Sequence, residues 1–139
     1  MEKLLKDFFP HAPNLGIYVD PHIPAKLLYN ATTDYAPEMD PEKVVVLLDL
    51  TLLKNARDGA LLGLDRMVFQ CTDFERPHVV PYRDIVGVAA KVGFFACKLI
   101  LSVNSGRATY EAAIDFSARG RKTLGYFQRF FEEVQLMPG

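Results

Sequence analysis

Residues 97–134 read CKLILSVNSGRATYEAAIDFSARGRKTLGYFQRFFEEV, and the spacing of the apolar residues changes within this stretch. In Cys97–Phe116 the apolar residues largely alternate with polar ones, which is the period of a strand with one buried face. In Leu124–Val134 they recur every three or four residues, which is the period of an amphipathic helix. The sequence therefore predicts two strands joined by a turn, followed by a C-terminal helix.

The alternation assigns each side chain of these strands to a face. The residues expected to face the core are Cys97, Leu99, Leu101, Val103, Ala108, Tyr110, Ala112, Ile114 and Phe116. The helical stripe consists of Leu124, Phe127, Phe131 and Val134, with Phe130 beside it. Ser117 is a candidate N-cap, because serine hydroxyls accept hydrogen bonds from free amides at helix starts.

Upstream of this stretch, short apolar runs separated by turn residues predict further strands. We expect strands at Val44–Leu50, Gly59–Leu64, Met67–Thr72 and His78–Val80, and another beginning at Asp84. Asp58-Gly59 is a typical hairpin signal. Asp49 is a polar residue inside the first run, so it is expected to bond a turn or to face solvent at a sheet edge. Because no strand–helix–strand crossover occurs, about seven antiparallel strands and an α+β class are predicted.

The first 42 residues differ in composition from the rest of the chain. They contain six of the nine prolines, with seven acidic residues against three basic ones, whereas residues 43–139 are net basic. Glu2–Phe9 predicts a short helix, and a second helix is expected to start near Pro24 with Leu27, Ala31 and Tyr35 on one face. We therefore expect a helical extension over residues 1–42, packed on a main domain over residues 43–139.

Length and composition exclude several classes of protein. The chain of 139 residues is half apolar and one quarter charged, as expected for one globular domain. No run approaches the roughly 20 apolar residues of a transmembrane helix. No export signal is evident and the only two cysteines are Cys71 and Cys97, which predicts reduced thiols and a cytoplasmic location. The net charge of −1 argues against a nucleic-acid partner, and the histidine spacing predicts neither a metal site nor a cofactor.

Several short motifs resemble those of uncharacterised bacterial proteins with a pleckstrin-homology-like (PH-like) domain. The motifs are residues 23–30 (IPAKLLYN), Val44–Leu50, Asp58-Gly59 and residues 82–85 (YRDI). The resemblance covers residues 43–137 and implies seven antiparallel strands in a half-open barrel, closed by a C-terminal helix. Because this family is poorly characterised, the resemblance implies a binding or assembly role more than an enzymatic activity. The fold serves many functions and cannot by itself name one.

In lipid-binding proteins of the PH-like fold, basic residues cluster in the loop between the first two strands. The corresponding cations here are Lys54 and Arg57, with Arg66 on the next hairpin, and they form a candidate ligand-binding site. Asp58 lies beside them, so ordinary solvated loop charges are the alternative interpretation.

A second group of cations lies just before the C-terminal helix. Arg119, Arg121 and Lys122 are placed where the helix dipole is already positive, so an anion there would be stabilising. A phosphate, an acidic protein surface or the acidic segment 1–42 would each stabilise this positive charge. The alternative interpretation is that the three cations are ordinary solvated surface charges.

Phe94 and Phe95 follow Gly93, which is expected to turn a hairpin. At the tip of that hairpin the two rings would mark a protein or membrane contact. If the strands extend further, the rings pack instead into the core and under the helix. We favour core packing.

No serine, cysteine or carboxylate lies in a catalytic motif, so the sequence predicts no enzyme activity. The leading interpretation is a module for protein–protein interaction or self-association, because a half-open barrel leaves strand edges free to pair. Binding of anionic lipid or phosphate at a membrane surface is the first alternative. A carrier of small apolar ligands, which would require a large internal cavity, is the second.

Overall fold

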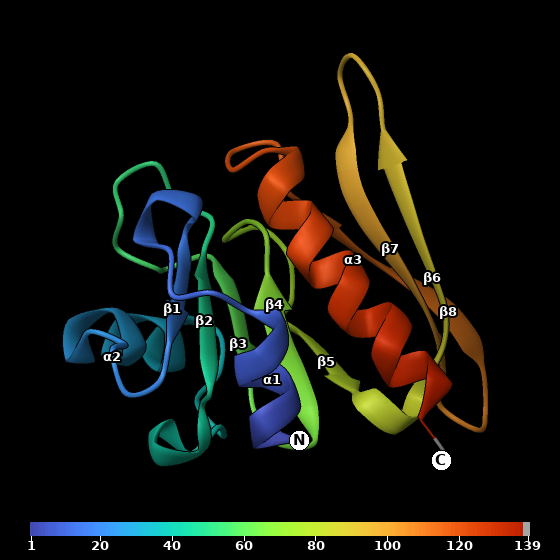
Figure 1. The fold of residues 1–139 in the computed structure, drawn as a ribbon, viewed down its shortest axis with the longest axis horizontal. Helices are drawn as coiled ribbons and strands as arrows, with labels where there is room; N and C mark the ends of the chain where they lie inside the picture. Colours follow the sequence, from blue (N-terminus) through green and yellow to red (C-terminus); the bar gives the residue numbers. More distant parts are fainter. Residues whose placement is uncertain (138–139) are drawn as a thin grey trace.

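The structure is a computed structural model that describes residues 1–137, which form three α-helices and eight β-strands. The helices are α1 (Glu2–Phe8), α2 (Ala25–Asp34) and α3 (Arg121–Leu136). The strands are β1 (Ile17–Val19), β2 (Val46–Asp49), β3 (Gly59–Leu62), β4 (Arg66–Gln70), β5 (His78–Pro81), β6 (Ile85–Val92), β7 (Cys97–Asn104) and β8 (Thr109–Asp115). Single 3-10 turns are η1 (Pro13–Leu15), η2 (Pro41–Lys43) and η3 (Tyr82–Asp84). Figure 1 shows their arrangement.

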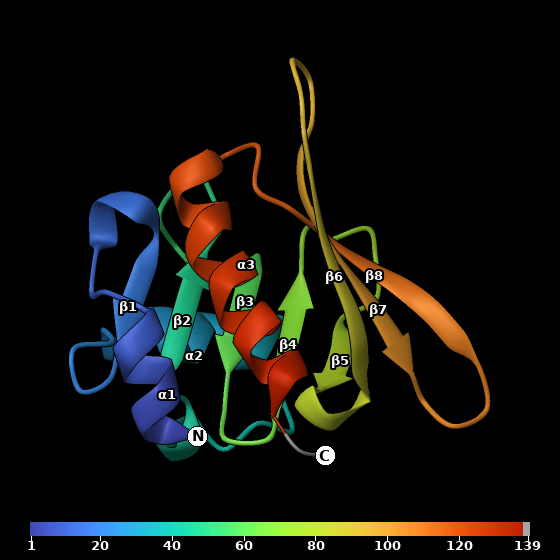
Figure 2. The ribbon, with the colours of Figure 1, turned by 45° about the vertical axis from the view of Figure 1, so that its right-hand side comes forward.

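The strands form two antiparallel sheets in which every hydrogen-bonded neighbour is also a sequence neighbour. The larger sheet has the order β1-β2-β3-β4-β5 and the smaller has the order β6-β7-β8. The predicted α+β class, antiparallel pairing and C-terminal helix are confirmed. The predicted seven-stranded barrel is not found, because the described strands form two separate sheets that do not close. Pro81 and η3 interrupt the chain between β5 and β6, where a continuous ladder would have to turn (Figure 2).

Strand β1 lies in the segment that the sequence predicts to be helical. Gly16 adopts a left-handed conformation with φ of 77° and reverses the chain after η1. Ile17 then pairs with Leu48 of β2, so the N-terminal segment contributes the first strand of the larger sheet. A strand of three residues is too short to produce a recognisable alternation, and this is why the sequence did not predict it.

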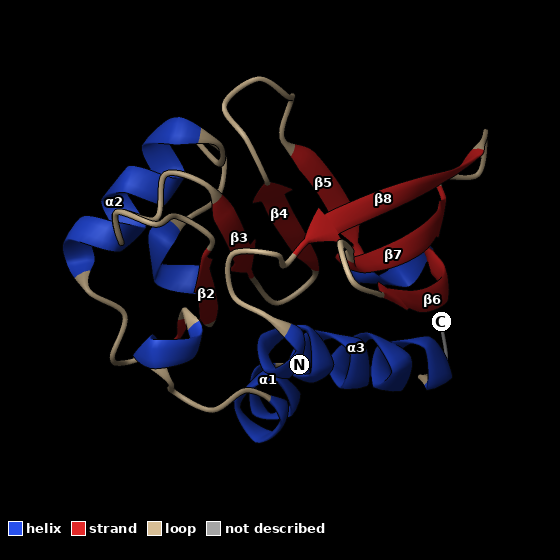
Figure 3. Cartoon of the chain, turned by 90° about the horizontal axis from the view of Figure 1, so that it is seen from above, coloured by secondary structure: helices blue, strands red, loops and turns tan. Residues whose placement is uncertain are grey.

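The main core lies between the two sheets and is covered by α3. All five predicted residues of the helical stripe are buried, namely Leu124, Phe127, Phe130, Phe131 and Val134. Helix α1 packs beside α3, with the Phe9 and Phe127 rings in an edge-to-face contact at 4.7 Å between centroids. Figure 3 shows α1 and α3 on the same side of the larger sheet, with α2 at the opposite side.

A second, smaller core lies on the outer face of the larger sheet. The predicted stripe of α2 is confirmed, because Leu27, Ala31 and Tyr35 are buried there. They pack with outward-facing strand residues that include Leu47 and Leu61. The sheet is therefore buried on both faces at β2 and β3, and this explains why those strands read as apolar runs without alternation.

Two predictions near the last strand were wrong. Ser117 does not cap α3: the N-cap is Gly120, and the Ser117 hydroxyl bonds to Asp115 instead. Ala108 and Tyr110 were expected to face the core but are exposed, Tyr110 by 41%, because they lie at the turn end of the β7–β8 hairpin. The remaining inward assignments in β7 and β8 agree with the burial of Leu99, Leu101, Val103, Ala112, Ile114 and Phe116.

Candidate functional site

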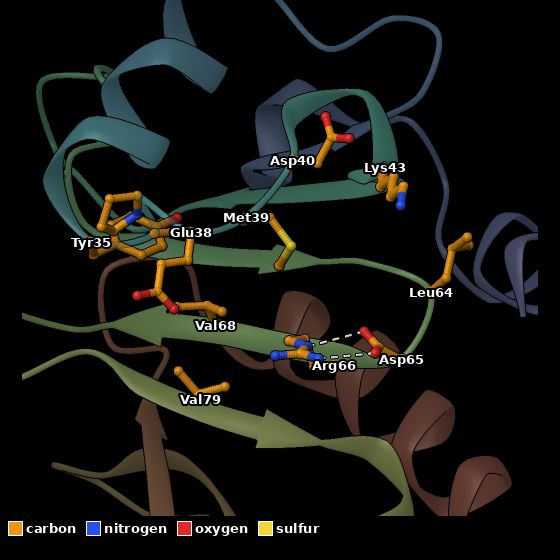
Figure 4. Close-up of a pocket in the computed structure, with 12 residues that line it drawn as sticks. Tyr35, Glu38, Met39, Asp40, Lys43, Leu64, Asp65, Arg66, Val68 and Val79 are labelled. Atoms are coloured by element: carbon orange, nitrogen blue, oxygen red, sulfur yellow. Dashed lines mark hydrogen bonds and ion pairs between the residues drawn. The ribbon is translucent and has the colours of Figure 1, made fainter.

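A groove of about 570 Å³ opens on the outer face of the larger sheet, beyond the point where α2 ends. Its floor includes Val68 of β4 and Val79 of β5, which are directly paired across the two strands. Its wall is the segment from Tyr35 to Lys43, from which Met39 points toward the floor (Figure 4). Binding pockets for small ligands typically have volumes of about 300–1,000 Å³ and mostly apolar walls, so the groove has the dimensions of a binding site.

The chain builds this wall because α2 cannot continue past Tyr35. Pro37 prevents further helix, and the Met39 amide donates to the Ala36 carbonyl in a tight turn. The Asp40 carboxylate then accepts a hydrogen bond from the Glu42 amide and starts η2. The segment therefore forms a wall beside the sheet and leaves Val79, on the outer face of β5, about half exposed.

Charged side chains of both signs surround the groove. Arg66 donates two hydrogen bonds to the Asp65 carboxylate, from Nε at 3.1 Å and from Nη2 at 3.0 Å. The hydrogen bond from Arg66 holds the pKa of the Asp65 carboxyl below its usual value. Both side chains are about half exposed or more, so this pair adds little to stability. Lys43, Glu38 and Asp40 complete the rim.

The structure does not bring Lys54, Arg57 and Arg66 into one site. Lys54 and Arg57 lie in the loop between β2 and β3, whereas Arg66 begins β4 at the opposite end of β3. Arg57 forms an ion pair with Asp34 of α2 at 3.5 Å. Arg66 is instead part of the groove rim.

Arg119 has a structural role that the sequence did not indicate. Its Nε donates to the Asp49 carbonyl at 2.6 Å and its Nη2 donates to the Thr51 carbonyl at 3.0 Å. The same Nη2 lies 3.8 Å from the buried Asp49 carboxylate. The other carboxylate oxygen of Asp49 accepts hydrogen bonds from the Thr51 amide and hydroxyl. Asp49 therefore bonds the turn after β2, which is one of the two roles predicted for it.

Arg121 and Lys122 remain exposed in the first turn of α3, as the anion-site prediction requires. Arg121 lies near Cys97, which begins β7 directly after the β6–β7 turn. Burial raises the pKa of the Cys97 thiol, the Asp115 carboxylate adds to the rise, and Arg121 opposes it. Anion binding by this pair stays a prediction.

Phe94 and Phe95 do not pack into the core, so the favoured interpretation of the sequence was wrong. They lie at the tip of the β6–β7 hairpin and are 94% and 93% exposed. The turn closes early because the Gly93 amide donates to the Ala96 carbonyl at 2.8 Å. Figure 2 shows this hairpin projecting well beyond the rest of the molecule.

The groove was not identified from the sequence, although its determinants are visible there. Pro37 and Pro41 bracket the wall, and Val79 stands between two prolines in a short strand. These residues predict the end of a helix and the edge of a sheet. Their juxtaposition depends on tertiary contacts between segments far apart in the chain, which local patterns do not report.

We also searched the described residues for metal sites, membrane-spanning helices and disulfides. Among residues 1–137, no cluster of three histidine, cysteine or acidic side chains is arranged to hold a metal ion. Within the same residues, no helix is both long and apolar enough to cross a bilayer. Both cysteines are free and partly buried.

Comparison with known proteins finds no matching family model, no matching curated protein and no matching solved structure. The resemblance to bacterial PH-like proteins therefore stays a prediction, as do the cytoplasmic location and the absence of enzyme activity.

Proposed function

We propose that this protein is a non-enzymatic binding module whose groove receives a short apolar segment of a partner protein. The observation that carries this proposal is the groove floor on the outer face of β4 and β5, where Val79 is 48% exposed beside its paired residue Val68. The adjacent outer face of β2 and β3 is buried under α2. The groove is thus an interruption in the cover of an apolar sheet, and a bound side chain would complete that cover.

The rim supports a peptide as the occupant. Positive and negative groups alternate around the groove: Lys43 and Arg66 lie near Glu38, Asp40 and Asp65. In a peptide segment, backbone amides can donate to carboxylates and backbone carbonyls can accept from cations, while a central apolar side chain enters the groove. The groove opens to solvent on the outer face rather than inside the core (Figure 4), so we place the small-ligand carrier behind peptide binding.

The arrangement also supports a PH-like fold in a modified form. We propose that β2–β5 correspond to the first four strands of that fold and β6–β8 to the last three, with α3 as its C-terminal helix. Strand β1 and helix α2 are then additions. The groove lies against these additions, so its function need not follow that of other proteins with this fold.

Selection of random displayed peptides on the immobilised full chain tests the proposal, with synthetic versions of the enriched peptides used for titration. We expect enriched peptides to share a central apolar residue and to bind the unmodified protein. Val79→Lys introduces a charge into the groove floor and should weaken their binding at least about tenfold. Val79 is 48% exposed, so the fold should tolerate this change.

Val86→Lys is the matched control, because Val86 is 51% exposed on β6 and lies outside the groove. Equal loss of binding in both variants, or no loss in Val79→Lys, would rule out the groove as the binding site. If the unmodified protein instead forms a dimer that only Val79→Lys dissociates, the occupant is a second copy of the chain.

A further inference from the structure

The β6–β7 turn and the end of β6 beside it are not covered by the rest of the molecule, whereas β7 pairs with β8 as far as Lys98. Every residue from 89 to 95 is exposed. Three of these seven residues are alanine or glycine, and the two phenylalanines are at the turn. Figures 1 and 2 show that the tip of the hairpin projects beyond the other elements in both views. Its sequence is therefore not explained by the needs of the core.

The tip of this hairpin is aromatic. The rings of Phe94 and Phe95 contact each other edge to face, with 4.9 Å between their centroids, and both are more than nine-tenths exposed. Two adjacent phenylalanines in water are unfavourable, because the hydrophobic effect favours their transfer to an apolar environment. Neither ring supports the turn, which is closed by the backbone bond from Gly93 to Ala96.

Two lysines flank the tip on opposite strands. Lys91 and Lys98 are directly paired in the ladder between β6 and β7. Like charges placed opposite each other in a sheet are destabilising. From Ile85 to Asn104 the chain contains no acidic residue that would offset them. Lys98 has Asp115 of β8 on its other side, but that carboxylate accepts hydrogen bonds from Ser117.

We infer that this hairpin anchors the protein to anionic membranes, with Phe94 and Phe95 inserted among the lipids and Lys91 and Lys98 at the headgroups. Each lysine lies three residues from the nearer phenylalanine, or roughly 10 Å along a strand. This spacing matches the roughly 5–10 Å depth to which interfacial segments insert. The surface is distinct from the groove of the proposed function and is independent of it.

The size of the tip favours a bilayer over a protein partner. Two phenylalanines bury about 300–500 Å² together, whereas a stable protein interface needs about 800 Å² from each partner. A bilayer has no such requirement, because it surrounds an inserted tip from all sides. An anionic lipid surface also neutralises both lysines, which a generic apolar protein surface does not.

The absence of tryptophan from the chain provides a direct test. In Phe94→Trp the only indole is at the hairpin tip, and its fluorescence reports insertion. We expect a blue shift on addition of vesicles containing phosphatidylglycerol and phosphatidylcholine, and quenching by brominated acyl chains. Pure phosphatidylcholine vesicles should produce neither. Tyr29→Trp is the control, because Tyr29 is 67% exposed on α2, away from the hairpin.

Sedimentation with the same vesicles measures the contribution of each group in the full chain. Phe94→Ser/Phe95→Ser should weaken binding more than about tenfold, and Lys91→Glu/Lys98→Glu at least about fivefold for each lysine. Lys3→Glu/Lys26→Glu makes the same change in net charge elsewhere and should reduce binding much less. Val79→Lys should leave vesicle binding unchanged, which separates this proposal from the groove.

The inference is overturned if Phe94→Trp shows no shift with anionic vesicles, or an equal shift with neutral ones. It is also overturned if Phe94→Ser/Phe95→Ser dissociates an oligomer in the absence of lipid while vesicle binding is unaffected. All substituted positions are exposed, so unchanged thermal unfolding of each variant will establish that the fold is retained.

Discussion

Arg119 is the residue whose environment differs most from its expected role. The sequence presents it beside Arg121 and Lys122 as one of three cations at a helix start. In the structure it bonds the turn after β2 and lies against the buried Asp49 carboxylate. The two partners are separated by 70 positions in the chain, so local sequence gives no sign of this contact.

Arg119→Ala should therefore destabilise the protein strongly. Removal of one partner leaves the Asp49 carboxylate buried without a compensating cation, which costs about 3–5 kcal/mol in comparable cases. Urea unfolding followed by circular dichroism will measure this loss. Arg121→Ala is the control, because Arg121 is exposed, and its effect should be within about 0.5 kcal/mol. Equal effects of the two changes would contradict the structural role of Arg119.

Cys71 provides a pH-dependent contribution to stability. Burial raises the pKa of its thiol to about 11, opposed by the Asp115 amide that donates to the sulfur and reinforced by nearby carboxylates. The unfolded chain loses this proton first, because its thiol titrates near 9. The contribution is therefore complete below about pH 9 and is lost as the pH rises toward 11.

In a Cys97→Ser background, the rate of alkylation of Cys71 should rise with pH to a midpoint near 11 in the folded protein. Alkylation of Cys71 at pH 8.5 should accordingly be slow, and it should become fast in urea. If the titration of the Cys71 thiol in the folded protein has its midpoint near pH 9, burial does not raise the pKa of this thiol.

At the scale of elements, apolar periodicity was the most informative signal. It predicted α1, α2, α3 and strands β2–β8, because each of them presents apolar side chains to a core. It missed β1, which has three residues, and it placed several strand ends one to two residues too far along the chain. It did not indicate the groove, and it left the exposure of Phe94 and Phe95 open, because both features depend on what neighbouring elements leave uncovered.

The junction between β2 and β3 depends on a single glycine. Gly59 has φ of 152°, and a Cβ added there would lie 1.9 Å from the Leu48 carbonyl oxygen. Gly59→Ala should therefore displace backbone and destabilise the protein by more than about 2 kcal/mol.

Gly93→Ala is the matched control for this prediction, because a Cβ there would meet no atom within 4 Å. Its unfolding midpoint in urea should barely change. A small effect of Gly59→Ala would indicate that the larger sheet can adjust its register at this junction.

For the whole molecule, the N-terminal 42 residues are part of both cores. Leu5 and Phe9 complete the main core, Leu27 and Ala31 cover the outer face, and β1 extends the sheet. The charge difference predicted from the sequence has a small structural counterpart, the ion pair between Asp34 and Arg57. Apolar packing accounts for the attachment of this segment far better than charge does.

A fragment comprising residues 43–139 should accordingly fail to fold cooperatively. It loses the ladder between β1 and β2 and exposes both Leu47 on the outer face and Phe127 under α1. We expect poor dispersion in a proton–nitrogen correlation spectrum and no cooperative unfolding transition. A well-dispersed spectrum with an unchanged urea midpoint would show instead that the extension is dispensable.

The exposure of the β6–β7 turn and of the end of β6 has a consequence for hydrogen exchange. The amides of this part are protected only by the ladder between β6 and β7, so they can open without opening either core. Amides from Ala89 to Ala96 should therefore exchange orders of magnitude faster than those of β2 or β3. The hairpin has its own local opening equilibrium, and it can bend or tilt on a surface while the body of the protein keeps its structure.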